Sequence, residues 1–125
     1  MRVKPIDELI SVLSEQAEQV EHLESLAATL VQNPQEIQRY RSVLEEKARL
    51  LSGLTHLTQP ITKKMVPEKA THVRSMLSKF SQSATSSLRI GSPFYMAALL
   101  YPQDYQQGQP NDLELFIQQL KEHQK

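Results

Sequence analysis

The most constraining feature of this sequence is an apolar stripe that runs through its first thirty residues. Apolar side chains recur there at steps of three and four residues, which is the spacing of one face of an α-helix. The stripe consists of Ile6, Leu9, Ile10, Leu13, Ala17, Val20, Leu23, Ala27 and Leu30. Pro5 suits the first turn of such a helix, because its missing N–H would have no partner there. The pattern predicts a helix over residues 5–32, about 40 Å long.

Prolines and capping residues divide the middle of the chain. Asn33 and Pro34 suit the start of a second helix, and Glu36 stands where a capping box places its carboxylate. Such a short connection predicts that the helix over 34–57 runs antiparallel to the first. Pro60 and Pro67 predict a connector over 58–67, followed by a third long helix over 67–89.

The last third of the sequence predicts two shorter helices. Gly91 ends the third helix, and Ser92-Pro93 begins a helix over 93–101 that is apolar on every side and is therefore expected to be buried all round. Asn111-Asp112 begins a final helix over 112–123. The predicted fold is all-α: an antiparallel up-down bundle of three long helices plus a C-terminal hairpin of two shorter helices, in one domain spanning residues 1–125.

Several classes of chemistry find no support in the composition. The sequence has no Cys, so it offers no disulfide, thiolate metal site or cysteine nucleophile. Its three glycines cannot form a phosphate-binding loop or a dinucleotide fingerprint, and it contains no Glu-x-x-His motif for a di-metal bundle. We therefore expect no catalytic residues, no metal and no cofactor, in a cytoplasmic protein that does not enter a membrane.

The formal net charge is zero, but the charge is unevenly distributed. Residues 1–32 hold two basic and six acidic residues, whereas residues 60–91 hold six basic residues and one acidic residue. One interpretation is that the acidic first helix lies near the basic third helix and neutralises it. The other is that the basic residues form a face for phosphate or an acidic partner. These residues are Lys63, Lys64, Lys69, Arg74, Lys79 and Arg89.

Aromatic residues are concentrated near the C-terminus, where five of the seven lie between residues 92 and 125. They either fill space between the long helices or form a contact site, since tyrosine is enriched at protein interfaces. The tyrosines flank a proline-containing loop, which is a typical place for recognition residues. The candidate partner-binding residues are Phe94, Tyr95, Met96, Tyr101 and Tyr105.

The sequence thus predicts a non-catalytic protein–protein interaction module, acting as an adaptor, chaperone or regulatory subunit through its helix faces and the tyrosine-bearing segment 94–105. The alternative is a nucleic-acid-associated protein that uses the basic region 63–89, although dedicated nucleic-acid binders usually carry a basic net charge. The first helix resembles a coiled coil, and Gln16 and Lys47 interrupt the apolar stripes of the first two helices. A polar residue in a stripe can set oligomer state, so a homo-oligomer, most simply a dimer, is expected.

Overall fold

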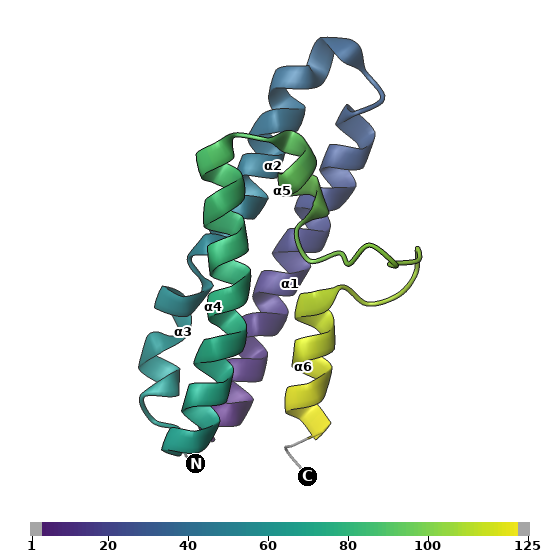
Figure 1. The fold of residues 1–125 in the computed structure, drawn as a ribbon. Helices are drawn as coiled ribbons and strands as arrows, with labels where there is room; N and C mark the ends of the chain where they lie inside the picture. Colours follow the sequence, from purple (N-terminus) through teal and green to yellow (C-terminus); the bar gives the residue numbers. More distant parts are fainter. Residues whose placement is uncertain (1–3, 123–125) are drawn as a thin grey trace.

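The structure is a computed structural model that describes residues 4–122, and all regular elements in that range are helices (Figure 1). This confirms the prediction of an all-α protein. The last position of the predicted final helix, His123, lies outside the described residues. In order, the elements are α1 (Pro5–Leu30), a short 3-10 helix (Pro34–Glu36), α2 (Ile37–Ser52), α3 (Leu54–Thr62), α4 (Pro67–Ile90), α5 (Pro93–Ala98) and α6 (Asp112–Glu122).

The α1–α2 hairpin and α4 form the long axis of the molecule. The two helices of the hairpin lie side by side in opposite directions, and their connected ends project beyond the end of α4 (Figure 1). At the connection, the Asn33 side chain accepts a hydrogen bond from the Gln35 backbone N–H at 3.0 Å. The α2 helix packs against both α1 and α4, which make hardly any direct contact with each other.

The prediction of one helix over 34–57, followed by a connector over 58–67, is wrong in two respects: the helix is interrupted within that range, and the chain then stays helical into the predicted connector. The helix is interrupted at Gly53, whose N–H is shared between the carbonyls of Arg49 and Leu50, and the chain then continues as α3 through Pro60 to Thr62. Pro60 removes the hydrogen bond that a residue there would donate to the carbonyl four residues back, at His56. Both residues lie on the exposed side of α3, so water can satisfy that carbonyl. The opposite side buries Thr58, Ile61 and Thr62.

The two short C-terminal helices do not form the predicted hairpin. The α5 helix packs against α2 and α4, whereas α6 packs against α1. Residues 99–111, which include Pro102 and Pro110, separate the two helices and carry no regular structure. Because this connection is long, each short helix covers a different part of the long helices.

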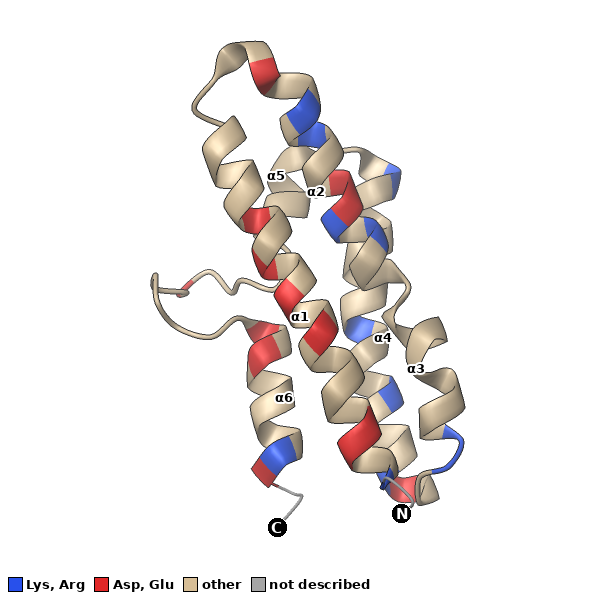
Figure 2. Ribbon diagram, turned by 180° about the vertical axis from the view of Figure 1, so that it is seen from behind, with Lys and Arg blue, Asp and Glu red and all other residues tan. Residues whose placement is uncertain are grey.

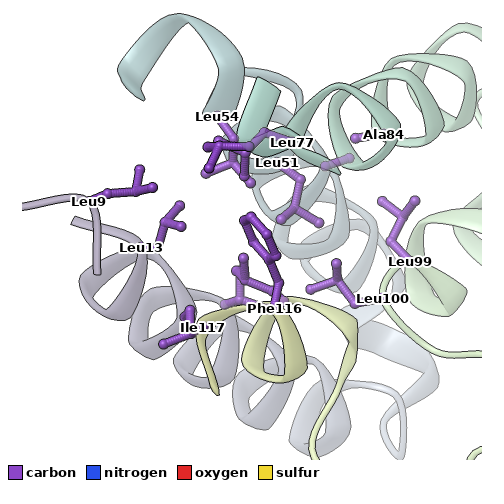
Figure 3. Close-up of a cluster of buried hydrophobic side chains, with 14 of the residues drawn as sticks. Leu9, Leu13, Leu51, Leu54, Leu77, Ala84, Leu99, Leu100, Phe116 and Ile117 are labelled. Atoms are coloured by element: carbon purple, nitrogen blue, oxygen red, sulfur yellow. The ribbon is translucent and has the colours of Figure 1, made fainter. Parts of the chain in front are cut away.

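A single cluster of buried apolar side chains draws on all six α-helices. Figure 3 shows Phe116 of α6 at its centre, facing leucines of α1, α2 and α4. The Phe116 ring centroid lies 6.3 Å from that of Phe80 and 6.5 Å from that of His72. Within residues 4–122, no helix combines the length and apolarity needed to cross a membrane.

Candidate protein-interaction surface

A groove runs between α4 and α6, and the segment that follows α5 forms part of its lining. It consists of two adjoining cavities of about 350 and 630 Å³. Ser83, Leu99, Leu100 and Asp112 line both cavities, so the two are continuous. We call this feature the α4–α6 groove.

The α4–α6 groove has an apolar floor and small polar side chains along its α4 edge. Its floor includes Leu51, Phe80, Leu99, Leu100 and Phe116, and its α4 edge includes Gln82, Ser83 and Ser86. Of the lining residues, Lys79 and Asp112 carry charge, and burial raises the pKa of the Asp112 carboxyl above its usual value. An apolar floor with a few polar groups is the usual character of a binding groove. The serines leave room for the close approach of a second backbone.

An exposed apolar corner adjoins the groove at the junction of α4 and α5. It consists of Ile90, Phe94 and Tyr95, which are 64%, 76% and 53% exposed. The rings of Phe94 and Tyr95 meet edge to face, with centroids 5.6 Å apart. Ile90 and Tyr95 also line the groove, so the corner and the groove form one continuous surface. Contiguous exposed apolar side chains of this kind mark interaction sites.

The structure separates the five aromatic-segment residues singled out from the sequence. Phe94 and Tyr95 are exposed, Met96 lies in the core at 3% exposed, and Tyr101 and Tyr105 are half-buried. The expectation that this helix is buried on every side is therefore wrong. The six-residue α5 has neighbours on two sides only, α2 and α4, and its remaining surface faces solvent.

A buried cation contacts the C-terminal end of α5 and the ring of Tyr101, which lines the groove. Lys47 of α2 is 1% exposed, and its Nζ lies 3.1 Å from Oε2 of Glu24 on α1. Nζ also donates a hydrogen bond to the Ala97 carbonyl at 3.2 Å and lies 5.2 Å from the centroid of the Tyr101 ring. Burial lowers the pKa of the Lys47 ammonium, and the Glu24 carboxylate opposes this shift. We call these four groups the Lys47 cluster.

Tyr101 links the Lys47 cluster to the loop that follows it. Its ring meets the Tyr105 ring edge to face at 4.6 Å, and the Tyr105 hydroxyl donates to the Gln109 carbonyl at 2.6 Å. Burial, reinforced by the neighbouring Glu24 carboxylate, raises the pKa of the Tyr101 hydroxyl above its usual value of 10.0. The two tyrosines thus hold the loop together and present only part of their surface to solvent.

Between α5 and Tyr101 the chain makes a strained turn. The Tyr101 N–H donates to the Ala98 carbonyl at 3.0 Å, and Leu100 at the third position of this turn has φ 76°. Glycine or asparagine usually occupies that position, because a positive φ is unfavourable for residues with a larger side chain. Leu100 is nevertheless buried, and its carbonyl accepts the Asp112 N–H at 2.9 Å where α6 begins.

The six basic residues from the sequence are all exposed but do not share one side of a helix (Figure 2). Lys69, Arg74 and Lys79 are spaced by five residues on α4, and each step of five rotates the side chain by about 140° around the axis. Lys64 pairs with Glu8 at 3.4 Å, and Arg74 donates to the Thr62 hydroxyl at 3.3 Å. Lys79 lines the α4–α6 groove.

The expected pairing between an acidic first helix and a basic third helix is not found. The α1 helix packs against α2, α3 and α6 instead of α4. Among the ion pairs of the described residues, Lys64–Glu8 is the one that joins the basic region to α1. Of the other carboxylates of α1, Glu24 pairs with Lys47 of α2, and Glu15, Glu18 and Glu21 are exposed. Figure 2, a view from behind, shows the acidic positions along α1.

No group of three or more His, Asp or Glu side chains in the described part of the chain is arranged to hold a metal ion. Comparisons with protein-family models, curated proteins and solved structures found no match to this chain. Its function must therefore be argued from the surface itself.

Proposed function

We propose that this chain is a non-catalytic protein-interaction module, an adaptor, chaperone or regulatory subunit, that binds its partner along the α4–α6 groove and the apolar corner. The observation that carries this proposal is the continuity of the two features. An apolar groove opens directly beside three exposed apolar side chains, Ile90, Phe94 and Tyr95. Phe and Tyr are enriched in protein interfaces, and Tyr is among the residue types that contribute most of the binding energy.

The shape of the groove favours a helical or extended segment as the bound element. The floor offers successive apolar contacts from Phe116 to Leu100, and Ser83 and Ser86 stand one turn apart along the α4 edge. An amphipathic helix placed there would bury its apolar face on the floor. The partner is another protein or a second copy of this chain, in which case a two-fold dimer is the simplest assembly.

The test is affinity capture with matched variants of the full chain. In one variant, Ser83→Arg with Ser86→Arg fills the groove. In its control, Ser75→Arg with Thr85→Arg adds the same charge to exposed positions of α4 outside the groove. We expect the wild type and the control to capture the same protein, and the groove variant to lose it. Phe94→Ala with Tyr95→Ala should weaken capture by about tenfold or more.

Three results would contradict the proposal. Capture that survives both the groove variant and the Phe94/Tyr95 variant would show that the surface is not used. Loss of the captured material on nuclease treatment, with steep dependence on salt, would favour the basic residues and nucleic acid instead. A captured protein that is chemically altered by the wild-type chain would show that the chain is an enzyme.

A further inference from the structure

The Lys47 ammonium joins four parts of the chain at one atom. The lysine itself comes from α2, its carboxylate partner Glu24 from α1, the Ala97 carbonyl from α5 and the Tyr101 ring from the following loop. Glu24 lies 23 residues from Lys47 in the sequence, and Ala97 lies 50 residues away. The described residues contain three other ion pairs, and all of these lie at exposed or half-exposed positions.

The helix that Lys47 contacts depends on outside support. The α5 helix has six residues, and a helix of that length is not stable alone in water. Its first turn is capped by the Ser92 hydroxyl, which accepts from the Tyr95 N–H at 3.3 Å. The carbonyls at the end of a helix need partners beyond its own regular hydrogen bonds, and Lys47 donates to one of them, at Ala97. A cation at this end also interacts favourably with the helix dipole.

The loop beyond α5 depends on the same cation. Tyr101 places its ring beside the ammonium and meets the Tyr105 ring edge to face, whereas the turn between α5 and Tyr101 is strained at Leu100. A strained turn persists only when surrounding contacts fix it. The contacts that fix this one are the buried side chains of Leu99 and Leu100 on one side and the Lys47 cluster on the other.

A buried ammonium is an expensive way to hold two helices together, because an apolar pair of similar volume often gives equal or greater stability. Its advantage is directional, since one cation can bind a carboxylate, a carbonyl and a ring at once. We propose that Lys47 is an electrostatic latch that holds α5 and residues 99–105 against the α1–α2 hairpin. Removing the ammonium or its Glu24 partner releases this segment as a unit and opens the end of the α4–α6 groove that Leu99, Leu100 and Tyr101 line.

Hydrogen exchange of the free protein tests the latch without any partner, so its outcome is independent of the proposed function. The variant is Lys47→Met, which keeps the length of the side chain and removes its charge. The Tyr101 and Asp112 N–H groups, bonded to the carbonyls of Ala98 and Leu100, report on the segment. We expect both to exchange about tenfold faster or more and to be much less protected than the middle of α1, which opens only when the whole protein unfolds. Lys69→Met, at an exposed lysine of α4, is the matched control and should change neither region.

Two further variants keep the test decisive if Lys47→Met folds poorly. Glu24→Gln leaves the lysine in place and removes the charge of its partner, and Glu24→Leu with Lys47→Met replaces the pair by apolar side chains. Both should retain the helical circular dichroism of the wild type and show the same local increase in exchange. Unchanged protection of Tyr101 and Asp112 in these folded variants would overturn the latch. Exchange of Tyr101 and Asp112 at the same rate as the middle of α1 would also overturn it, because the segment would then open only together with the whole protein.

Discussion

The α1–α2 hairpin and the C-terminal region 93–122 are held in place by different means. Along the hairpin, small apolar contacts are distributed over the length of two helices, from Leu9 to Leu30 on α1 and from Leu44 to Leu51 on α2. The C-terminal region depends on a few separate contacts: the Lys47 cluster, the buried Leu99 and Leu100, the cap at Asn111, and Phe116 in the core.

This difference explains why the candidate surface lies where it does. A region with distributed contacts opens only when the whole protein unfolds, whereas a region held by a few contacts can open locally. Interaction surfaces commonly belong to the second kind and are supported by the first. The comparison predicts that single substitutions in the C-terminal region have sharply different effects, according to which contact they remove.

The largest effect is expected at Phe116, the point at which α6 enters the core. Phe116→Ala removes a buried ring that contacts Phe80 and His72, and should lower the free energy of unfolding by about 4 kcal/mol. Leu30→Ala, at the end of the hairpin, should cost about 2 kcal/mol, because the site can relax more easily. Urea denaturation measures both values. If Phe116→Ala cost as little as Leu30→Ala, α6 would not belong to the cooperative unit.

A somewhat smaller loss is expected when the buried cation loses its partner. Glu24→Ala leaves the Lys47 ammonium without a carboxylate and should cost about 3 kcal/mol. Glu18→Ala, at an exposed position of the same helix, should change stability by less than about 0.5 kcal/mol. The same denaturation experiment measures both. Equal values for the two variants would mean that the Glu24 carboxylate does not stabilise the buried Lys47 ammonium.

The strained turn offers a smaller and more specific comparison. Leu99 and Leu100 are buried to a similar extent, but only Leu100 has a positive φ. Leu100→Gly loses the same burial as Leu99→Gly and relieves backbone strain, so it should cost about 1 kcal/mol less. The difference in free energy of unfolding between the two variants is the quantity to measure. A larger cost for Leu100→Gly would contradict the strain.

The smallest effect is expected from the ionisation of Tyr101. Its pKa is raised in the folded protein, so its contribution to stability is complete below about pH 10 and is lost as the pH rises further. Between pH 10 and 11 the wild type should therefore lose stability relative to Tyr101→Phe, by less than about 1 kcal/mol once solvent screening is allowed for. Because both proteins retain Lys47, titration of that residue largely cancels in the comparison. No divergence between the two stability curves would show that Tyr101 is solvated.

The long helices could be predicted from the sequence because their signals are local. The apolar stripe of α1 and the Pro67 and Gly91 boundaries of α4 lie within a few residues of the structure they specify. The side-chain caps of Asn33, Ser92 and Asn111 form where the sequence predicts a helix start, but the capping-box role expected of Glu36 is not found. Glu36 pairs with Arg39, while the reciprocal capping box forms at Asn111 and Glu114, where each side chain accepts the other's N–H at 2.9 Å.

The candidate surface could be predicted only in part. Aromatic clustering pointed to Phe94 and Tyr95, but the groove depends on the separation of α4 and α6, which no local pattern encodes. Lys47 was visible as a charge inside an apolar stripe, and it suggested self-association. In the structure Lys47 binds Glu24 and the Ala97 carbonyl of the same chain, both distant in the sequence. The lysine therefore gives no support to a dimer.

The packing of α6 against α1 also determines the order in which the fold can be completed. The α1–α2 hairpin joins two helices that follow each other in the sequence, and contacts of low sequence separation form fastest. The face of α1 that packs against α6, by contrast, is covered only after residues 112–122 exist. Because a chain is synthesised from its N-terminus, this apolar face remains open to other chains until the last described helix docks. Docking of α6 therefore ends the exposure of this α1 face to other chains.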